Sequence, residues 1–194
     1  MPIQKKKKRT LIIILSIILT GLIFRGPLYR VVIKYQPIAE RPNYTITNPE
    51  LIEICKIKGT PEKNSSIKDI IRSSHVITSD LLEFSFTQAE TDPNKLVNTH
   101  KANCVGYAAL FAAVCNHQFV TLKRAPDWTA TPYKGQLYLF GVNIHPYIQS
   151  PFFKDHDFVI IRNKNTGETY AADPSIRDYL RINYITLKSN RRHD

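Results

Sequence analysis

Cys104 occupies a position in the sequence where a cysteine can act as a nucleophile. It follows a polar run, residues 98–103, and precedes an Ala-rich apolar stretch at residues 108–115. Such a stretch predicts a helix buried on all sides, with Asn103 as its N-cap. Cys104 would then lie in the first helical turn, where the partial positive charge of the helix N-terminus favours the thiolate. The N–H groups of that turn would also offer an oxyanion site beside the sulfur.

A hairpin later in the chain supplies partners for such a cysteine. Residues 156–162 and 168–173 have the composition of strands and are separated by a turn-forming segment. A two-residue turn in the middle of that segment would set His156 opposite Asp173, with Cβ atoms roughly 5 Å apart. A bulge at Gly167 would shift this register by one residue. In the paired register, the carboxylate would hold one imidazole nitrogen and leave the other for the thiol.

Each of these three residues also has a structural interpretation. Cys104 would then be a buried core thiol, and His156 and Asp173 an exposed polar pair across two strands. Asp155 and Asp157 are weaker partners for the histidine, because strand neighbours point to the opposite face of a sheet. The catalytic interpretation therefore requires Cys104, His156 and Asp173 to meet in space.

The cysteine count limits the other chemistry. The three cysteines are Cys55, Cys104 and Cys115, so at least one has no intrachain disulfide partner. The chain has no CxxC, HxxxH or HExxH pattern, which makes a structural zinc site improbable. A Cys55–Cys115 disulfide that spares Cys104 stays open, as does a packed core thiol at Cys115. We expect neither a metal nor a cofactor.

The segments around the three residues resemble the transglutaminase-like superfamily. They are the Cys104 helix with Tyr107, Ala108, Leu110 and Phe111, the strand that begins at His156, and the run Tyr170-Ala-Ala-Asp173-Pro174-Ser175. The order Cys, His, Asp and the spacing are similar to that family, and the likeness covers about residues 67–180. The resemblance implies an α+β, papain-like core, in which a helix carrying the cysteine packs on an antiparallel sheet. It also implies action on amide bonds through Cys104, His156 and Asp173, in a family that includes inactive relatives.

The N-terminus has the pattern of a signal-anchor. A basic run at residues 5–9 precedes residues 11–24, which carry no charge. A helix over that apolar stretch would span about 21 Å, less than the ~30 Å of a bilayer's hydrocarbon core. We therefore predict a transmembrane segment over 10–33 that is lengthened through residues 28–33, with Arg25 and Arg30 extending to the interface.

Other fates of the segment stay open. One is a cleaved signal peptide, although residues 24–27 make a poor cleavage site, and another is a cytosolic protein. For an anchor, the positive-inside rule predicts a cytoplasmic tail at residues 1–9. The rest of the chain would then lie on the non-cytoplasmic side, in the periplasm or at the cell surface.

The charge balance does not indicate a nucleic-acid partner. The chain carries 27 Lys and Arg against 16 Asp and Glu, a net charge of +11. Residues 5–9 contribute five of these charges, and the others are scattered without a nucleic-acid-binding motif. An anionic lipid or an acidic wall polymer is a better match for a basic protein beside a membrane.

The remaining pattern suggests one domain behind a stalk. Four prolines interrupt residues 34–66, which we interpret as a stalk and entry segment before a domain at 67–194. Within the domain we expect a helix from Ser66 to about 84–86, and a long loop at residues 125–135. Strands are expected at the following segments: 118–122, 137–142, 156–162, 168–173 and 184–187.

The sequence thus predicts a membrane-anchored thiol enzyme. It would act on amide bonds of a protein or peptide substrate, as a hydrolase or an acyltransferase, through Cys104, His156 and Asp173. The alternative is a catalytically inactive binding module of the same fold tethered to the membrane. A third candidate is a lipid- or wall-binding protein that uses its basic surface.

Overall fold

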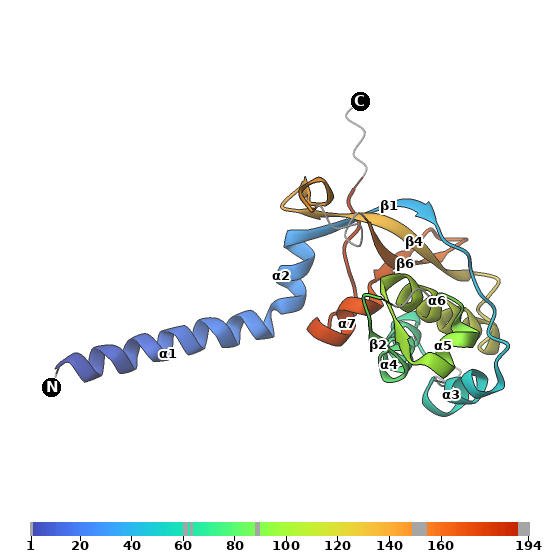
Figure 1. Ribbon diagram of the computed structural model, residues 1–194, viewed down its shortest axis with the longest axis horizontal. Coiled ribbons are helices and arrows are strands. Elements are labelled where there is room, and N and C mark those ends of the chain that lie inside the picture. Colours follow the sequence, from blue (N-terminus) through green and yellow to red (C-terminus); the bar gives the residue numbers. More distant parts are fainter. Residues whose placement is uncertain (1, 60–61, 63, 88–89, 149–154, 190–194) are drawn as a thin grey trace.

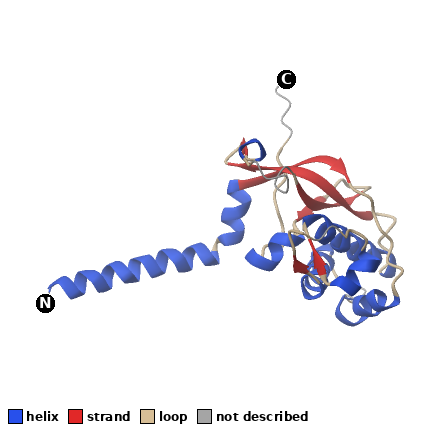
Figure 2. Cartoon of the chain, viewed as in Figure 1, coloured by secondary structure: helices blue, strands red, loops and turns tan. Residues whose placement is uncertain are grey.

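A five-stranded sheet and a layer of helices on one of its faces make up the domain (Figure 1). The arrangement comes from a computed structural model, which describes residues 2–59, 62, 64–87, 90–148 and 155–189. Strands gather on one side and most helices on the other, while helix α1 projects away from both (Figure 2). The predicted α+β class with an antiparallel sheet is confirmed.

The elements follow the order helix, strand, helices, then strands. The helices are α1 (Pro2–Ile23), α2 (Arg25–Val32), α3 (Pro49–Gly59), α4 (Ile67–Leu81), α5 (Pro93–Thr99), α6 (Cys104–Thr121), η1 (His145–Tyr147) and α7 (Pro174–Leu180). The strands are β1 (Ile33–Glu40), β2 (Glu83–Phe84), β3 (Lys101–Ala102), β4 (Trp128–Leu139), β5 (Val142–Asn143), β6 (His156–Asn163) and β7 (Thr169–Ala172). The main sheet has the order β1-β4-β6-β7, with β5 paired to β4, and β2 and β3 form a separate parallel pair.

Strand β4 corrects the predicted loop at 125–135. It pairs with β1 on one side and β6 on the other, from Trp128 to Leu139. Pro132 and Gly135 gave the segment the composition of a loop. Alternate burial at the start of the strand, where Trp128 and Ala130 face the core, is the period-two pattern of a strand.

Strand β1 corrects the predicted stalk over residues 34–40. It pairs antiparallel with β4 from Ile33 to Glu40, so these residues belong to the sheet. Pro37 lies at a register shift between β1 and β4. Such an irregularity in the strand pairing tolerates a residue that has no backbone N–H. The predicted strand at 184–187 reduces to a single parallel bridge between Tyr35 and Leu187.

Helix α6 is longer than predicted and is the buried centre of the domain. Residues 118–121, which we expected in a strand, form its last turn. The Gln118 Nε2 group donates a hydrogen bond to Ser74 Oγ on α4, and Phe119 is fully buried. These tertiary contacts outweigh the strand propensity of the β-branched residues at 120 and 121.

Gly135 lies on β4 between Pro37 of β1 and His156 of β6. It faces His156 in the sheet register, and an added Cβ would lie 2.3 Å from Phe158 Cε1 and 2.7 Å from the Gln36 carbonyl oxygen. Because one neighbour is backbone, we expect Gly135→Ala to destabilise the fold by about 1–3 kcal/mol. Urea unfolding of the full chain in neutral detergent measures this loss. Gly21→Ala is the control, since its Cβ would meet nothing within 4 Å, and equal midpoints for the two variants would contradict the close packing.

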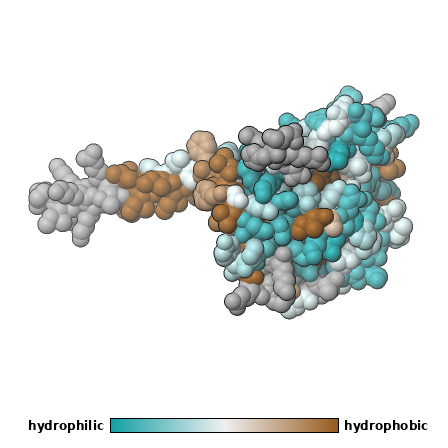
Figure 3. Space-filling model, turned by 90° about the horizontal axis from the view of Figure 1, so that it is seen from above, coloured by the Kyte–Doolittle hydropathy of each residue, from teal (hydrophilic) through white to brown (hydrophobic). Residues whose placement is uncertain are grey.

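The apolar N-terminal segment is bent. Helices α1 and α2 meet at an angle of 71°, and together they meet the length and hydropathy criteria of a broken membrane span. Helix α6 also meets these criteria, but it is the buried core helix of the domain. The apolar side chains of α1 from Leu11 onward are exposed (Figure 3). The bend at Phe24 separates the apolar stretch of α1 from residues 28–33, through which we predicted the segment to be lengthened.

Candidate active site

Cys104 is the first residue of helix α6, as predicted. The Asn103 side chain caps the helix by accepting the N–H groups of Val105 and Gly106 at 3.0 and 3.3 Å. The N–H of Cys104 is not one of the groups that this cap satisfies, so it remains a donor beside the sulfur. The Cys104 side chain is buried, which removes the thiol from bulk water.

His156 and Asp173 meet, although by a register other than the predicted one. The His156 Nε2 atom lies 2.5 Å from Asp173 Oδ2. The predicted cross-strand pairing of these two residues is wrong, because Val159 rather than Asp157 lies opposite the end of β7, at Ala172. A longer turn closed by Gly167 sets this register. Asp173 therefore lies just beyond β7, as the N-cap of α7.

Five donors surround the Asp173 carboxylate. Its Oδ1 atom accepts the Ser175 N–H at 3.1 Å, the Ser175 hydroxyl at 2.7 Å and the Ile176 N–H at 3.2 Å. Its Oδ2 atom accepts the Tyr35 hydroxyl at 2.8 Å, in addition to the imidazole. Burial raises the pKa of Asp173, but the positive charge and hydrogen bond of His156 outweigh burial and lower this pKa overall. The carboxylate is thus fixed and ionised.

The surroundings of His156 favour its charged form. Its burial lowers the pKa of the imidazole, but the charge of Asp173, and hydrogen bonds to Asp173 and Cys104, raise this pKa well above the ordinary value. Because Nε2 is engaged by Asp173, Nδ1 is the nitrogen that remains for the thiol. The structure therefore brings Cys104, His156 and Asp173 together in the order that a thiol triad requires.

Tyr35 and Tyr29 extend this network toward the N-terminal helices. The Tyr35 and Tyr29 hydroxyls lie 2.6 Å apart, so a chain of hydrogen bonds runs from α2 through β1 to Asp173. Burial raises the pKa of Tyr35 well above its ordinary range, which keeps the hydroxyl protonated as a donor to the carboxylate. Sequence reasoning missed both tyrosines because it assigned them to the anchor and the stalk.

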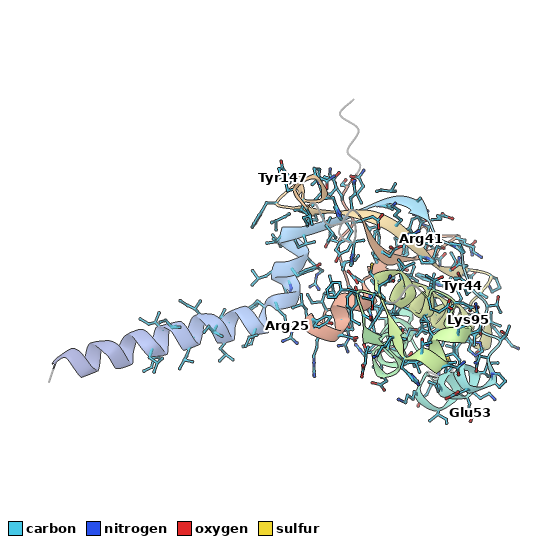
Figure 4. All side chains as sticks on the ribbon, viewed as in Figure 1. Arg25, Arg41, Tyr44, Glu53, Lys95 and Tyr147 are labelled. Carbon is cyan, nitrogen blue, oxygen red and sulfur yellow. The ribbon has the colours of Figure 1, made fainter. Side chains whose placement is uncertain are left out.

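Arg41 and Asp157 form an ion pair close to the thiol. The Arg41 Nε and Nη2 groups donate to the two Asp157 oxygens at 2.7 and 3.2 Å (Figure 4). The Asp157 side chain is fully buried, whereas that of Arg41 is 33% exposed. Burial raises the pKa of Asp157, and Arg41 opposes this effect. The hydrogen bond to Asp157 is the main reason why the pKa of Arg41 is raised.

Neither neighbour of His156 in the sequence joins the triad. Asp157 binds Arg41, and Asp155 lies 2.7 Å from the Lys134 ammonium. No local pattern pointed to Arg41, because its partner Asp157 lies 116 positions away along the chain.

The other two cysteines differ from Cys104 in their surroundings. Cys55 and Cys115 are buried in the helical layer, and burial raises their pKa values to about 11 and about 12. None of the three cysteines, all of which the structure describes, forms a disulfide, so the Cys55–Cys115 bridge that the sequence left open is absent. Within the described ranges, no group of three or more His, Cys, Asp or Glu side chains is arranged to hold a metal ion.

Comparisons with known proteins do not add an assignment. No protein-family model matches the chain, and no curated protein matches its sequence. The function must therefore be argued from the site itself.

Proposed function

We propose that the protein is a thiol enzyme that acts on amide bonds, with Cys104 as nucleophile, His156 as proton carrier and Asp173 as the residue that orients the imidazole. The observation that carries this proposal is the 2.5 Å contact between His156 Nε2 and Asp173, made by a histidine that also hydrogen-bonds the thiol at a helix N-terminus. A helix that starts at the cysteine and packs on an antiparallel sheet also supports membership of the transglutaminase-like, papain-type class.

The chemistry follows from the positions of these atoms. The Cys104 sulfur attacks the carbonyl carbon of the amide, and the Cys104 N–H stabilises the oxyanion. His156 then gives its Nδ1 proton to the departing amine as the C–N bond breaks, which leaves an acyl-enzyme. Water or a second amine, deprotonated by His156, attacks the thioester and releases the thiol. The first nucleophile gives hydrolysis and the second gives acyl transfer.

We also propose that α1 anchors the enzyme in a membrane. The exposed apolar side chains of α1, after the basic run at residues 5–9, support a signal-anchor. In this arrangement the lysines stay on the cytoplasmic side and the domain acts on protein or peptide substrates beyond the membrane.

Selective alkylation of Cys104 tests the proposed chemistry. The full chain in neutral detergent is treated with iodoacetamide at pH 6, and each cysteine is followed by peptide mass spectrometry. An ordinary thiol, with a pKa of about 8.5, is mostly protonated at this pH and reacts slowly. We expect Cys104 to react about 100-fold faster than Cys55 and Cys115, which are internal references, and His156→Ala to remove this difference.

The same measurement has a clear opposite outcome. If Cys104 reacts at pH 6 as slowly as an ordinary thiol in the folded protein, and His156→Ala changes nothing, the enzyme proposal is wrong. The protein would then be a binding module with this fold. A positive result justifies a screen of peptide amides, with Cys104→Ala as the inactive control.

A further inference from the structure

An open hollow lies where the end of helix α7 meets the bend between α1 and α2. Its volume is about 400 Å³. The residues that line it are Leu22, Ile23, Arg25, Gly26, Pro27 and Arg181. The hollow therefore joins the last apolar turn of α1 to basic side chains from two separate elements, of which Figure 4 labels Arg25.

The positive charge around this hollow is only partly balanced. Burial lowers the pKa of Arg177, which lies one turn before Arg181 on α7, and the charges of Arg181 and Arg25 lower it further. The charge of Asp178 opposes this effect, and its Oδ2 atom accepts the Tyr107 hydroxyl at 2.6 Å. Among the described residues, the buried Nε of Arg177 has no hydrogen-bond partner. An anion in the hollow would reduce the repulsion among the three guanidinium groups.

Exposed apolar side chains lie on the same elements as these arginines. Phe24 and Leu28 extend from the bend and α2, and Tyr179 and Leu180 from the end of α7. This apolar surface is continuous along the chain with the exposed surface of α1 (Figure 3). Aromatic and basic residues at the end of an apolar helix are typical of the interface between hydrocarbon and headgroups.

We propose that this hollow binds the phosphate of an anionic phospholipid and thereby docks the C-terminal end of α7 on the membrane surface. A phosphodiester supplies acceptors that match the guanidinium donors, and its acyl chains lie along the apolar side chains of α1. The occupant is a lipid headgroup rather than free phosphate, because two of the six lining residues, Leu22 and Ile23, are apolar and belong to the anchor helix α1. The inference rests on the membrane anchor of the proposed function and not on the thiol chemistry.

Lipid retention by the full chain tests this proposal. The protein in neutral detergent is mixed with equal amounts of phosphatidylglycerol and phosphatidylcholine of the same acyl chains, and bound lipid is counted by native mass spectrometry. We expect the wild type to retain phosphatidylglycerol about 10-fold over phosphatidylcholine. Arg25→Gln/Arg181→Gln should abolish this preference, whereas Lys68→Gln/Lys123→Gln, which removes the same charge from exposed positions elsewhere, should preserve it.

Three results would overturn the proposal. The first is equal retention of the two lipids by the wild type. The second is the same loss of preference in both double variants, because this would indicate only general attraction by net charge. The third is full displacement of the lipid by equimolar inorganic phosphate, which would indicate a free-anion site. Urea midpoints confirm that both double variants fold. Since Cys104 takes no part in the readout, the result is independent of the thiol reactivity.

Discussion

Asp173→Asn should slow the turnover of an amide substrate by about 1,000-fold or more, and slow alkylation of Cys104 at pH 6 by about 100-fold. The charge of Asp173 is the largest of the influences that raise the pKa of His156, and without it burial would lower that pKa. An amide at position 173 can also donate its N–H₂ to Nε2. The imidazole would then carry its proton on Nδ1 and could not accept the proton of the thiol.

The asparagine variant separates this electronic role from a structural one. Asp173 is the N-cap of α7, and Asn is an equally good N-cap, so the helix should persist. Tyr35→Phe is the matched variant, because it removes one hydrogen bond to the carboxylate and keeps the charge. We expect Tyr35→Phe to slow the turnover of the amide substrate by about 10-fold or less. The rate of Cys104 alkylation in Asp173→Asn is measured from pH 5 to pH 9. If this rate equals that of the wild type, the carboxylate does not support the histidine.

Arg41→Ala should lower the free energy of unfolding by about 2–4 kcal/mol at pH 7. The change leaves the Asp157 carboxylate fully buried without its partner, and an unpaired buried charge is far more costly than a lost surface ion pair. Urea unfolding of the full chain in detergent measures this decrease in the free energy of unfolding. Arg72→Ala, which breaks the exposed pair with Asp69, is the control and should cost at most about 0.5 kcal/mol.

The pH dependence of this loss has a definite sign. Burial already raises the pKa of Asp157 in the folded protein, and removal of Arg41 should raise it further. A raised carboxyl pKa means that the folded state binds the proton more tightly than the unfolded state, so the deficit of Arg41→Ala should shrink as the pH falls. Arg41→Ala/Asp157→Asn should recover most of the stability at pH 7. A deficit that grows toward acid pH would contradict the buried charge as its cause.

Local signals allowed part of the site to be predicted. Asn103 before an apolar run defined the start of α6 and the position of Cys104, because a helix cap depends on residues next to it in the sequence. The contact of His156 with Asp173 was predicted from a hairpin whose register was wrong by two positions. It forms because Asp173 caps α7 and turns its carboxylate toward His156.

Features that depend on distant parts of the chain could not be predicted. Residues 128–135 contain Pro132 and Gly135, which are typical of a loop, but pairing on both sides makes them a central strand. The stalk assignment failed for the same reason, because the partner of β1 lies about 100 residues later. Tyr35 and Arg41 acquire their roles through this strand, so they were missed together with it.

The position of Tyr35 has a consequence for biosynthesis. Its N–H donates to the Thr186 carbonyl, and its carbonyl accepts the Lys188 N–H, so the segment around residue 187 closes over β1. The hydroxyl of the same residue bonds the carboxylate 138 positions away. A nascent chain therefore cannot complete these contacts before residue 188 has left the ribosome. The full set of hydrogen bonds around Tyr35 should form late in synthesis, after all the strands of the sheet have been made.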